Sequence, residues 1–277
     1  MTEQSLPVIE IAPTSGWRAL DLREIWQYRE LLQILTWRDV KVRYRQTLLG
    51  VIWVVAQPLL TMIIFTLLFN RVAKISADHG LPYSLFVMAA LVPWTFFSTG
   101  VTGSGNSLIG SAHLISKVYF PRMIIPASSV LAGLVDMAVT LGLVLVMYVW
   151  YAVPLSWSLL IVPLPIAVTA VLAFGFGLWF SALNVEYRDV RVVIPFLLQM
   201  WMYATPVVYP LKALPQKFHW IVFVNPVTGV VDAFRACLLG EPLPWARLAY
   251  SAAVGIVVMI TGAFYFRRVE RLFADVL

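Results

Sequence analysis

The sequence predicts an all-α polytopic membrane protein with six membrane-spanning helices. Hydrophobic residues make up 61% of the 277 residues and charged residues only 12%, whereas a soluble domain has about 45–50% apolar and about 25% charged residues. The mean hydropathy of +0.84 agrees with this composition. The apolar residues also gather in stretches of about 20 residues, the length that crosses the hydrocarbon core of a bilayer as a helix.

The charge balance excludes several other classes of protein. The chain has 20 Lys and Arg residues and 14 Asp and Glu residues, a formal net charge of +6. The basic residues flank apolar stretches instead of forming a phosphate-binding surface, so nucleic acid is not an expected partner. Soluble single-domain enzymes, disordered chains and collagen-like chains are excluded as well. The single cysteine, Cys237, cannot form an internal disulfide.

Each expected span is bounded by charged or aromatic residues. Arg45 and Arg71 flank the first span, and Tyr83, Trp150 and Trp157 lie at the ends of later ones, as in an interfacial aromatic belt. The transmembrane domain covers residues 47–268, and its six spans are residues 47–69, 83–102, 123–150, 157–182, 192–209 and 248–266.

Residues 220–240 are apolar enough to suggest a seventh span. With six spans and both termini cytosolic, 14 of the Lys and Arg residues lie inside and six outside, which obeys the positive-inside rule better than seven spans. Residues 210–247 then form an outer gate segment with re-entrant or interfacial helices, and residues 1–25 and 269–277 are cytosolic tails. The residues that interrupt the seventh stretch are Asn225, Pro226, Asp232 and Arg235.

Residues 26–46 lack Pro and Gly and are expected to form an amphipathic helix. The pattern suits a helix that lies in the cytoplasmic headgroup layer, with its basic side chains reaching lipid phosphates. An ordinary cytosolic helix docked on protein is the alternative. The helical wheel places Trp37, Val40 and Tyr44 on one face, and Arg38, Lys41 and Arg45 beside it.

The inner loop over residues 103–122 contains a second amphipathic pattern, which predicts a helix over about residues 107–119 that Pro121 stops. The next inner loop is short and rich in charges. Either loop could serve packing or solvation alone, or could contact a cytosolic partner. The helical stripe consists of Leu108, Ala112, Ile115 and Tyr119, with His113, Ser116 and Lys117 around it, and the second loop holds Glu186, Arg188, Asp189 and Arg191.

Motifs for catalysis are missing from the sequence. No Lys follows a Gly, so the P-loop pattern GxxxxGK[ST] is absent. The three histidines lie in separate segments without metal-ligand spacing. We therefore expect no cofactor or metal bound by this chain and no enzymatic activity. Asp136, a carboxylate within an expected span, either lines a water-filled path or is bonded structurally, and the sequence reveals no basic partner for it inside the membrane.

Several blocks, in order, resemble the membrane subunit of type-2 ABC exporters of bacterial cell-surface polysaccharide. The similarity covers about residues 31–273. Because many blocks occur in the right order, the resemblance is specific where one block alone would be weak. The blocks are WRDVKVRYR at residues 37–45, LGVIW at 49–53, LVPW at 91–94, KVYFPR at 117–122, YRDV at 187–190, PVVYP at 206–210, and NP at 225–226 with AFR at 233–235.

The resemblance implies a fold, partners and a location. Members have six membrane helices, an N-terminal interfacial helix and short outer helices before the last span. They work in the bacterial inner membrane as homodimers with two copies of a separate ATP-binding subunit, which uses ATP and Mg²⁺. Their substrates are long glycans such as O-antigen, capsule or teichoic acid, here expected to be linked to a polyprenyl diphosphate lipid.

Other classes of function remain open at this stage. A drug or small-lipid exporter of the same superfamily shares the topology. A membrane glycan transferase would need clustered acids at the membrane face, whereas the inner loops offer only Glu186 and Asp189, each beside arginines. A secondary transporter would need ion-binding groups in repeated helices.

The family's architecture gives the two inner loops an expected role. A permease without its own ATPase must receive force from the ATP-binding subunit, and an amphipathic helix beside a charged turn suits that contact. The residues expected to couple the chain to that subunit are Ser107, Leu108, Ala112, His113, Ile115, Ser116, Lys117, Tyr119, Glu186, Arg188 and Asp189.

A long glycan needs a continuous channel whose walls release each sugar readily, and aromatic faces meet this need through dispersion contacts with C–H groups. Phe196 and Tyr203 are seven residues apart and share a helix face, with Gln199 close to it, whereas Trp201 lies on another face. We expect Phe196, Gln199 and Tyr203 to line the path, with Trp179 as a weaker candidate.

The topology is testable by cysteine labelling in a Cys237-free background. Both termini should react only from the cytosolic side, and residues 220–240 should never be exposed on it. A tag placed after Leu277 that is accessible only from the periplasm would contradict six spans.

Overall fold

The computed structural model describes seven stretches of the chain, and the described residues are helical with no strand, which confirms the all-α fold class. The expected tail over residues 1–25, the end of the other tail from residue 271, Ser116 and Arg188 lie outside the described residues. The described residues are 26–45, 51–72, 74, 82–115, 117–153, 156–187 and 189–270.

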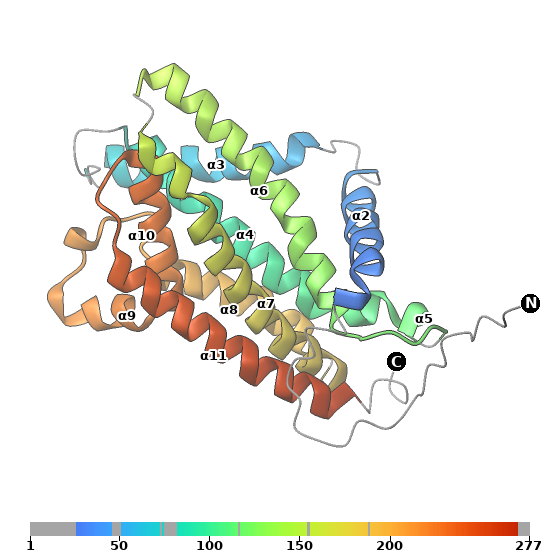
Figure 1. Ribbon diagram of the computed structural model, residues 1–277. Helices are drawn as coiled ribbons and strands as arrows, with labels where there is room; N and C mark the ends of the chain where they lie inside the picture. Colours follow the sequence, from blue (N-terminus) through green and yellow to red (C-terminus); the bar gives the residue numbers. More distant parts are fainter. Residues whose placement is uncertain are drawn as a thin grey trace, which may run out of the picture.

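The helices follow one another along the chain in a bundle of long elements with shorter helices at its two ends (Figure 1). The long elements are α2 (Arg29–Arg45), α3 (Val51–Phe65) with η1 (Thr66–Val72), α4 (Tyr83–Gly110), α6 (Ile124–Tyr151), α7 (Pro163–Glu186), α8 (Val190–Ala204), α10 (Pro226–Leu239) and α11 (Trp245–Val269). The short elements are α5 (Ala112–Ile115), η3 (Trp157–Ile161), η4 (Leu211–Ala213), η5 (Gln216–Phe218) and α9 (His219–Val224).

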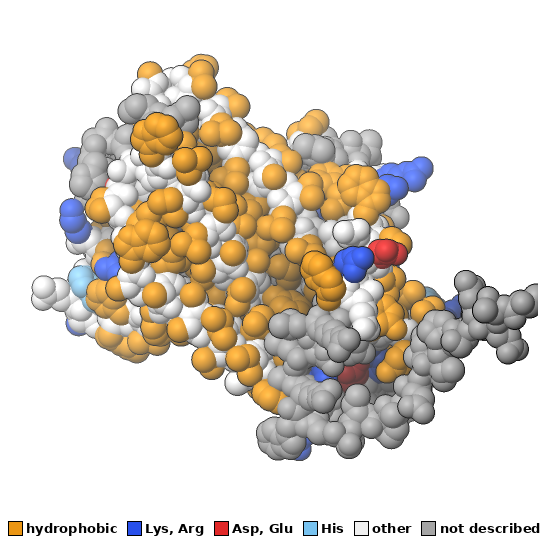
Figure 2. Space-filling view, in the orientation of Figure 1, with side chains coloured by type: hydrophobic (Ala, Val, Ile, Leu, Met, Phe, Trp, Pro, Cys, Tyr) orange, Lys and Arg blue, Asp and Glu red, His pale blue; other side chains and the backbone are white. Residues whose placement is uncertain are grey.

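Five helices of the described chain are long and apolar enough to cross a membrane, and up to six if one bent pair counts as a span. The bent pair consists of residues 216–224 and α10, which meet at 92°, within the stretch expected to be re-entrant or interfacial. The hydrophobic surface in Figure 2 covers most of the visible face, and Lys and Arg side chains gather toward its ends. The chain is therefore a multi-pass membrane protein.

The expected fifth span, residues 192–209, is the shorter helix α8. It has 15 residues and ends at Ala204, so it is about 22 Å long at 1.5 Å per residue. It ends there because Thr205 precedes Pro206, and a residue before proline is pushed out of the helical region. Thr205 has the extended dihedrals φ −101° and ψ 136°. The prediction was wrong about the length of this helix.

α4 is the central helix of the bundle and continues past the expected end of the second span to Gly110. It is buried along most of its length, whereas α3 is largely exposed. Small residues let its neighbours approach closely: a Cβ added to Gly100 would lie 3.1 Å from the Ala173 Cβ on α7. Because α4 continues to Gly110, the expected inner loop is shorter than residues 103–122.

A close contact also joins α7 to α11. A Cβ added to Gly175 would lie 2.7 Å from the backbone nitrogen of Met259, and one added to Gly262 would lie 2.8 Å from the Gly175 carbonyl oxygen. Real Cβ atoms do not approach backbone this closely. The two helices therefore pack backbone against backbone, as small residues allow in membrane bundles.

This contact predicts the effect of enlarging one glycine. Gly175→Leu should destabilise the protein by about 1–3 kcal/mol or more, because overpacking forces the helices apart. Gly142→Ala, where an added Cβ meets nothing within 4 Å, should be neutral or stabilising by up to about 1 kcal/mol. Thermal unfolding in detergent, followed by size-exclusion chromatography, measures both. Equal melting temperatures for the two variants would contradict the close packing.

Candidate functional site

The expected coupling residues gather at one end of the bundle. This end, which we call the junction, is formed by α2, α5, the start of α6 and the last turns of α4, α7 and α11 (Figure 1). A hydrophobic core separate from the main one holds these elements together. Its buried side chains include Leu35, Leu108, Ile115, Phe120, Ile124, Val185 and Phe266.

The helix expected over residues 107–119 is not continuous. α4 ends at Gly110, Ser111 adopts the non-helical dihedrals φ −118° and ψ 18°, and α5 is a single turn. The chain then turns so that Phe120, 4% exposed, enters the junction core. Burial of this aromatic ring and the proline after it favour a turn over a longer helix.

The residues of the expected amphipathic stripe differ in their burial. Leu108 and Ile115 are buried in the junction core, whereas Tyr119 is 69% exposed. The segment therefore offers one face to the protein and an exposed surface beyond it. Ser107 and Ala112 are half-buried, and His113 and Lys117 are exposed.

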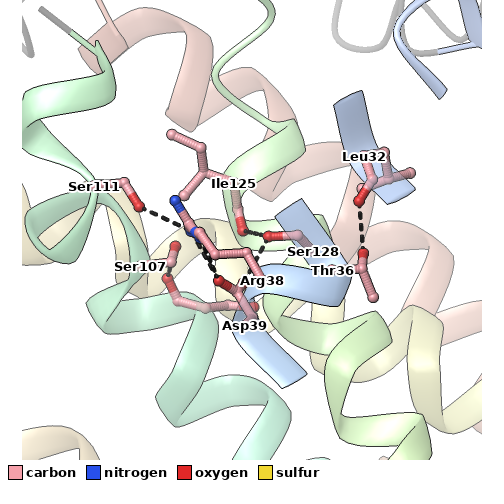
Figure 3. Close-up of polar contacts among 9 residues, drawn as sticks. Leu32, Thr36, Arg38, Asp39, Ser107, Ser111, Ile125 and Ser128 are labelled. Carbon is pink, nitrogen blue, oxygen red and sulfur yellow. Dashed lines mark hydrogen bonds and ion pairs between the residues drawn. The ribbon is translucent and has the colours of Figure 1, made fainter. Parts of the chain in front are cut away.

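A polar cluster ties α2 to the junction (Figure 3). The Arg38 guanidinium pairs with Asp39 at 2.8 Å and donates to the Ser111 hydroxyl at 3.4 Å. The Ser128 hydroxyl, on α6, donates to the other carboxylate oxygen of Asp39 at 2.9 Å. Ser107 is bonded within its own helix, to the Ser104 carbonyl. Arg38 thus contacts protein, where the sequence predicted a contact with lipid phosphate.

The two alternatives for the N-terminal helix each describe one side of α2. Leu35 and Val40 are buried against the protein. Trp37 is 59% exposed, and the Lys41 ammonium lies 5.5 Å from the centre of its ring. α2 is therefore docked on protein and still presents an aromatic and basic side, on which Arg45 is also exposed. Its position in a headgroup layer stays a prediction.

Asp136, on α6, has two partners from α2. Arg43 forms an ion pair with it, and the Tyr44 hydroxyl donates to it. Burial, and then the hydrogen bond to Asp136, raises the pKa of Tyr44 above its ordinary value, so this hydroxyl stays protonated and donates. The sequence revealed no basic partner for Asp136 inside the membrane, and the partner in the structure, Arg43, comes from a helix outside the expected spans.

The expected second coupling loop is also tied to the junction. The side-chain amide of Asn184 donates to the Gly105 carbonyl at 2.7 Å, and the Tyr265 hydroxyl donates to Glu186 at 2.9 Å. These bonds connect the end of α7 to α4 and α11. Asp189 is exposed at the start of α8. The two expected coupling segments therefore lie at the same end of the molecule.

The aromatic residues of α8 fall on two sides. Trp201 packs edge-on against Phe97 and Phe176, with ring centroids 5.3 and 5.0 Å away, and its indole N–H donates to Asn225 at 2.9 Å. Phe196 is 63% exposed and Tyr203 50% exposed, and Gln199 is exposed near them. Their role in a glycan path stays a prediction.

Trp179 is separate from this exposed face, because its ring stacks on that of Tyr265 of α11, with centroids 4.7 Å apart, and its indole N–H donates to Thr261.

Among the described residues, no three His, Cys, Asp or Glu side chains are grouped so that they could hold a metal ion.

The fold and the junction define a multi-pass helical membrane protein with a compact assembly of loops and helix ends on one side. A family model described as ABC-2 type transporter matches residues 30–239. The chain belongs to this family, which confirms the resemblance found in the sequence.

The chain is similar to several transport proteins of this family. The chain is 31% identical, over 90% of its length and 95% of the relative, to a Klebsiella pneumoniae protein named O-antigen export system permease protein RfbA. It is also 31% identical to a Myxococcus xanthus protein of that name, over 92% and 98% of the two chains. It is 23% identical to the Escherichia coli polysialic acid transport protein KpsM, over 86% and 93%.

The junction core predicts how the segment after α4 responds to truncation. Ile115→Ala should cost about 2–5 kcal/mol where the side chain is buried. The segment should then open locally, and its amides should exchange with solvent faster. Val118→Ala, at a position that is 52% exposed, is the matched control. Hydrogen exchange with mass spectrometry measures both, and equal protection in the two variants would contradict this role of the core.

Proposed function

We propose that this chain is the channel-forming permease subunit of an ATP-driven exporter that moves a lipid-linked polysaccharide, such as O-antigen, across the bacterial inner membrane. The similarity to O-antigen export permeases over nine-tenths of the chain is the observation that carries this proposal. The more distant relationship to a polysialic acid transport protein supports the same class of substrate.

Energy for transport comes from a second subunit. The sequence has no GxxxxGK[ST] pattern, so ATP and Mg²⁺ are bound by a separate ATP-binding subunit. Two copies of each subunit form the exporter, and both termini of the permease are cytosolic. The junction then faces the ATP-binding subunits, with His113, Lys117, Tyr119 and Asp189 exposed on its surface.

The path for the glycan follows the exposed side of α8. Phe196 and Tyr203 present aromatic faces, and Gln199 adds a polar group. Aromatic faces contact the C–H groups of sugars without strong charge pairing. A chain of many sugars needs such repeated, weak contacts.

Removal of the chain tests the proposed function. Cells that lack the permease should lose the surface polysaccharide and accumulate the lipid-linked glycan on the cytosolic side, and expression of the wild-type chain should restore export. The purified complex should contain an ATP-binding subunit. Unchanged surface glycan in the deletion strain, together with a change in lipid or drug export, would contradict the proposal.

The path is tested by shortening its aromatic residues. Phe196→Ala with Tyr203→Ala should reduce surface glycan by about tenfold, because two stacking contacts of about 0.5–1.5 kcal/mol each are lost. Ile256→Ala with Ile260→Ala, at exposed positions of α11, is the control and should export normally. Immunoblots of surface glycan, at equal permease levels, measure both. Equal export by the two double variants would exclude this face.

A further inference from the structure

The ion pair at Asp136 lies where a charge is hardest to accommodate. Asp136 is near the middle of α6, a 28-residue helix that is long and apolar enough to span the membrane. Its side chain is 18% exposed, and that of Arg43 is 32% exposed. A lone carboxylate or guanidinium in such surroundings is strongly disfavoured, so the two groups remain together as long as both are charged.

The second contact to Asp136 comes from the next residue of α2. The Tyr44 hydroxyl donates to one carboxylate oxygen while Arg43 binds the other. Both oxygens are therefore engaged by the same helix, which fixes the direction of the carboxylate as well as its distance. The Thr140 hydroxyl binds the backbone carbonyl of Asp136 and leaves the carboxylate to α2.

A second polar contact joins the same two helices one turn earlier on α2. Asp39 accepts a hydrogen bond from Ser128, which precedes Asp136 on α6. The side chains of Leu35 and Val40 are buried on the inner side of α2. With two separate polar attachments along its length, α2 cannot slide or rotate on α6 without breaking one of them.

Residues of α2 that precede Arg43 contact the segment expected to bind the ATP-binding subunit. Arg38 donates to Ser111, the residue between α4 and α5. Leu35 shares the junction core with Ile115. A displacement of α5 therefore acts on α2 through a hydrogen bond and through apolar packing.

We propose that Arg43 and Tyr44 are positioning residues that clamp α2 to Asp136, so that α2 and α6 move as one body when the ATP-binding subunit displaces the junction. The inference rests on the proposed function. The clamp transmits motion from the junction to the middle of a membrane helix. It also explains why a carboxylate is present inside that helix.

A role in stability alone makes a different prediction from a role in positioning. If the ion pair only neutralises two charges, replacing both residues by apolar ones should preserve folding and glycan export. Apolar replacements of ion pairs are often neutral or stabilising. If the pair positions α2, the apolar replacement folds but does not transmit motion, because it lacks a directional contact.

The test compares glycan export with ATP hydrolysis by the complete exporter, normalised to the amount of folded complex. Asp136→Asn and Arg43→Gln should each lower glycan exported per ATP hydrolysed by about tenfold or more. Tyr44→Phe should lower it less, by about twofold to tenfold, because one hydrogen bond is lost. Glu30→Gln, which removes a charge at an exposed position of α2, is the matched control and should keep the wild-type ratio.

The double variant Arg43→Leu with Asp136→Leu decides between the two roles. The proposal predicts wild-type amounts of folded complex, continued ATP hydrolysis and low export. Wild-type export by this variant would overturn the proposal, as would a parallel fall of export and ATP hydrolysis in Asp136→Asn. Failure of the proposed function is distinguishable, because the wild-type complex would then export no glycan.

Discussion

The arrangement of the junction depends on the interaction of Arg43 and Tyr44 with Asp136. A carboxylate inside an apolar helix needs a partner, and here the partner helix is α2. This requirement holds the C-terminal end of α2 beside the middle of α6, so its earlier residues, Arg38 and Asp39, fall next to Ser111 and Ser128. One electrostatic constraint thus fixes the C-terminal end of α2 on α6, while the junction core holds α2 against the segment after α4.

The bundle to which α2 is attached has glycines at several of its closest helix contacts. α7 meets α11 at Gly175 and Gly262, and α4 meets α7 at Gly100. Such contacts exclude large sliding motions, because any shift brings backbone atoms into collision. The exposed surfaces of α3 and α8, by contrast, leave apolar and aromatic residues available to a second copy or to substrate. A rigid centre with open flanks is compatible with the proposed pairing of two permease chains.

Composition and hydrophobic stretches were sufficient to predict an all-α polytopic protein, since burial in lipid demands long apolar helices. Predictions from local sequence patterns failed where contacts between distant residues determine the structure. The expected helix over residues 107–119 breaks at Ser111 because Phe120 is buried in a core built from distant helices. The partner of Asp136 was missed because Arg43 is 93 positions away in the sequence. The available signal was the one-turn spacing of Asp39 and Arg43, which puts two charges on one side of α2. The end of α8 at Ala204 was predictable from Pro206, because Thr205, the residue before this proline, is pushed out of the helical region.

The central claim is that α2 and α6 move together. The most direct measurement is the distance between spin labels at Gln33 on α2 and Val146 on α6, both exposed, in a Cys237→Ser background, without nucleotide and after trapping with ATP and vanadate. The account predicts that this distance within one protomer changes by less than about 2 Å, while the distance between the Gln33 labels of the two protomers changes. A shift of about 5 Å or more between Gln33 and Val146, one turn of a helix, would contradict it.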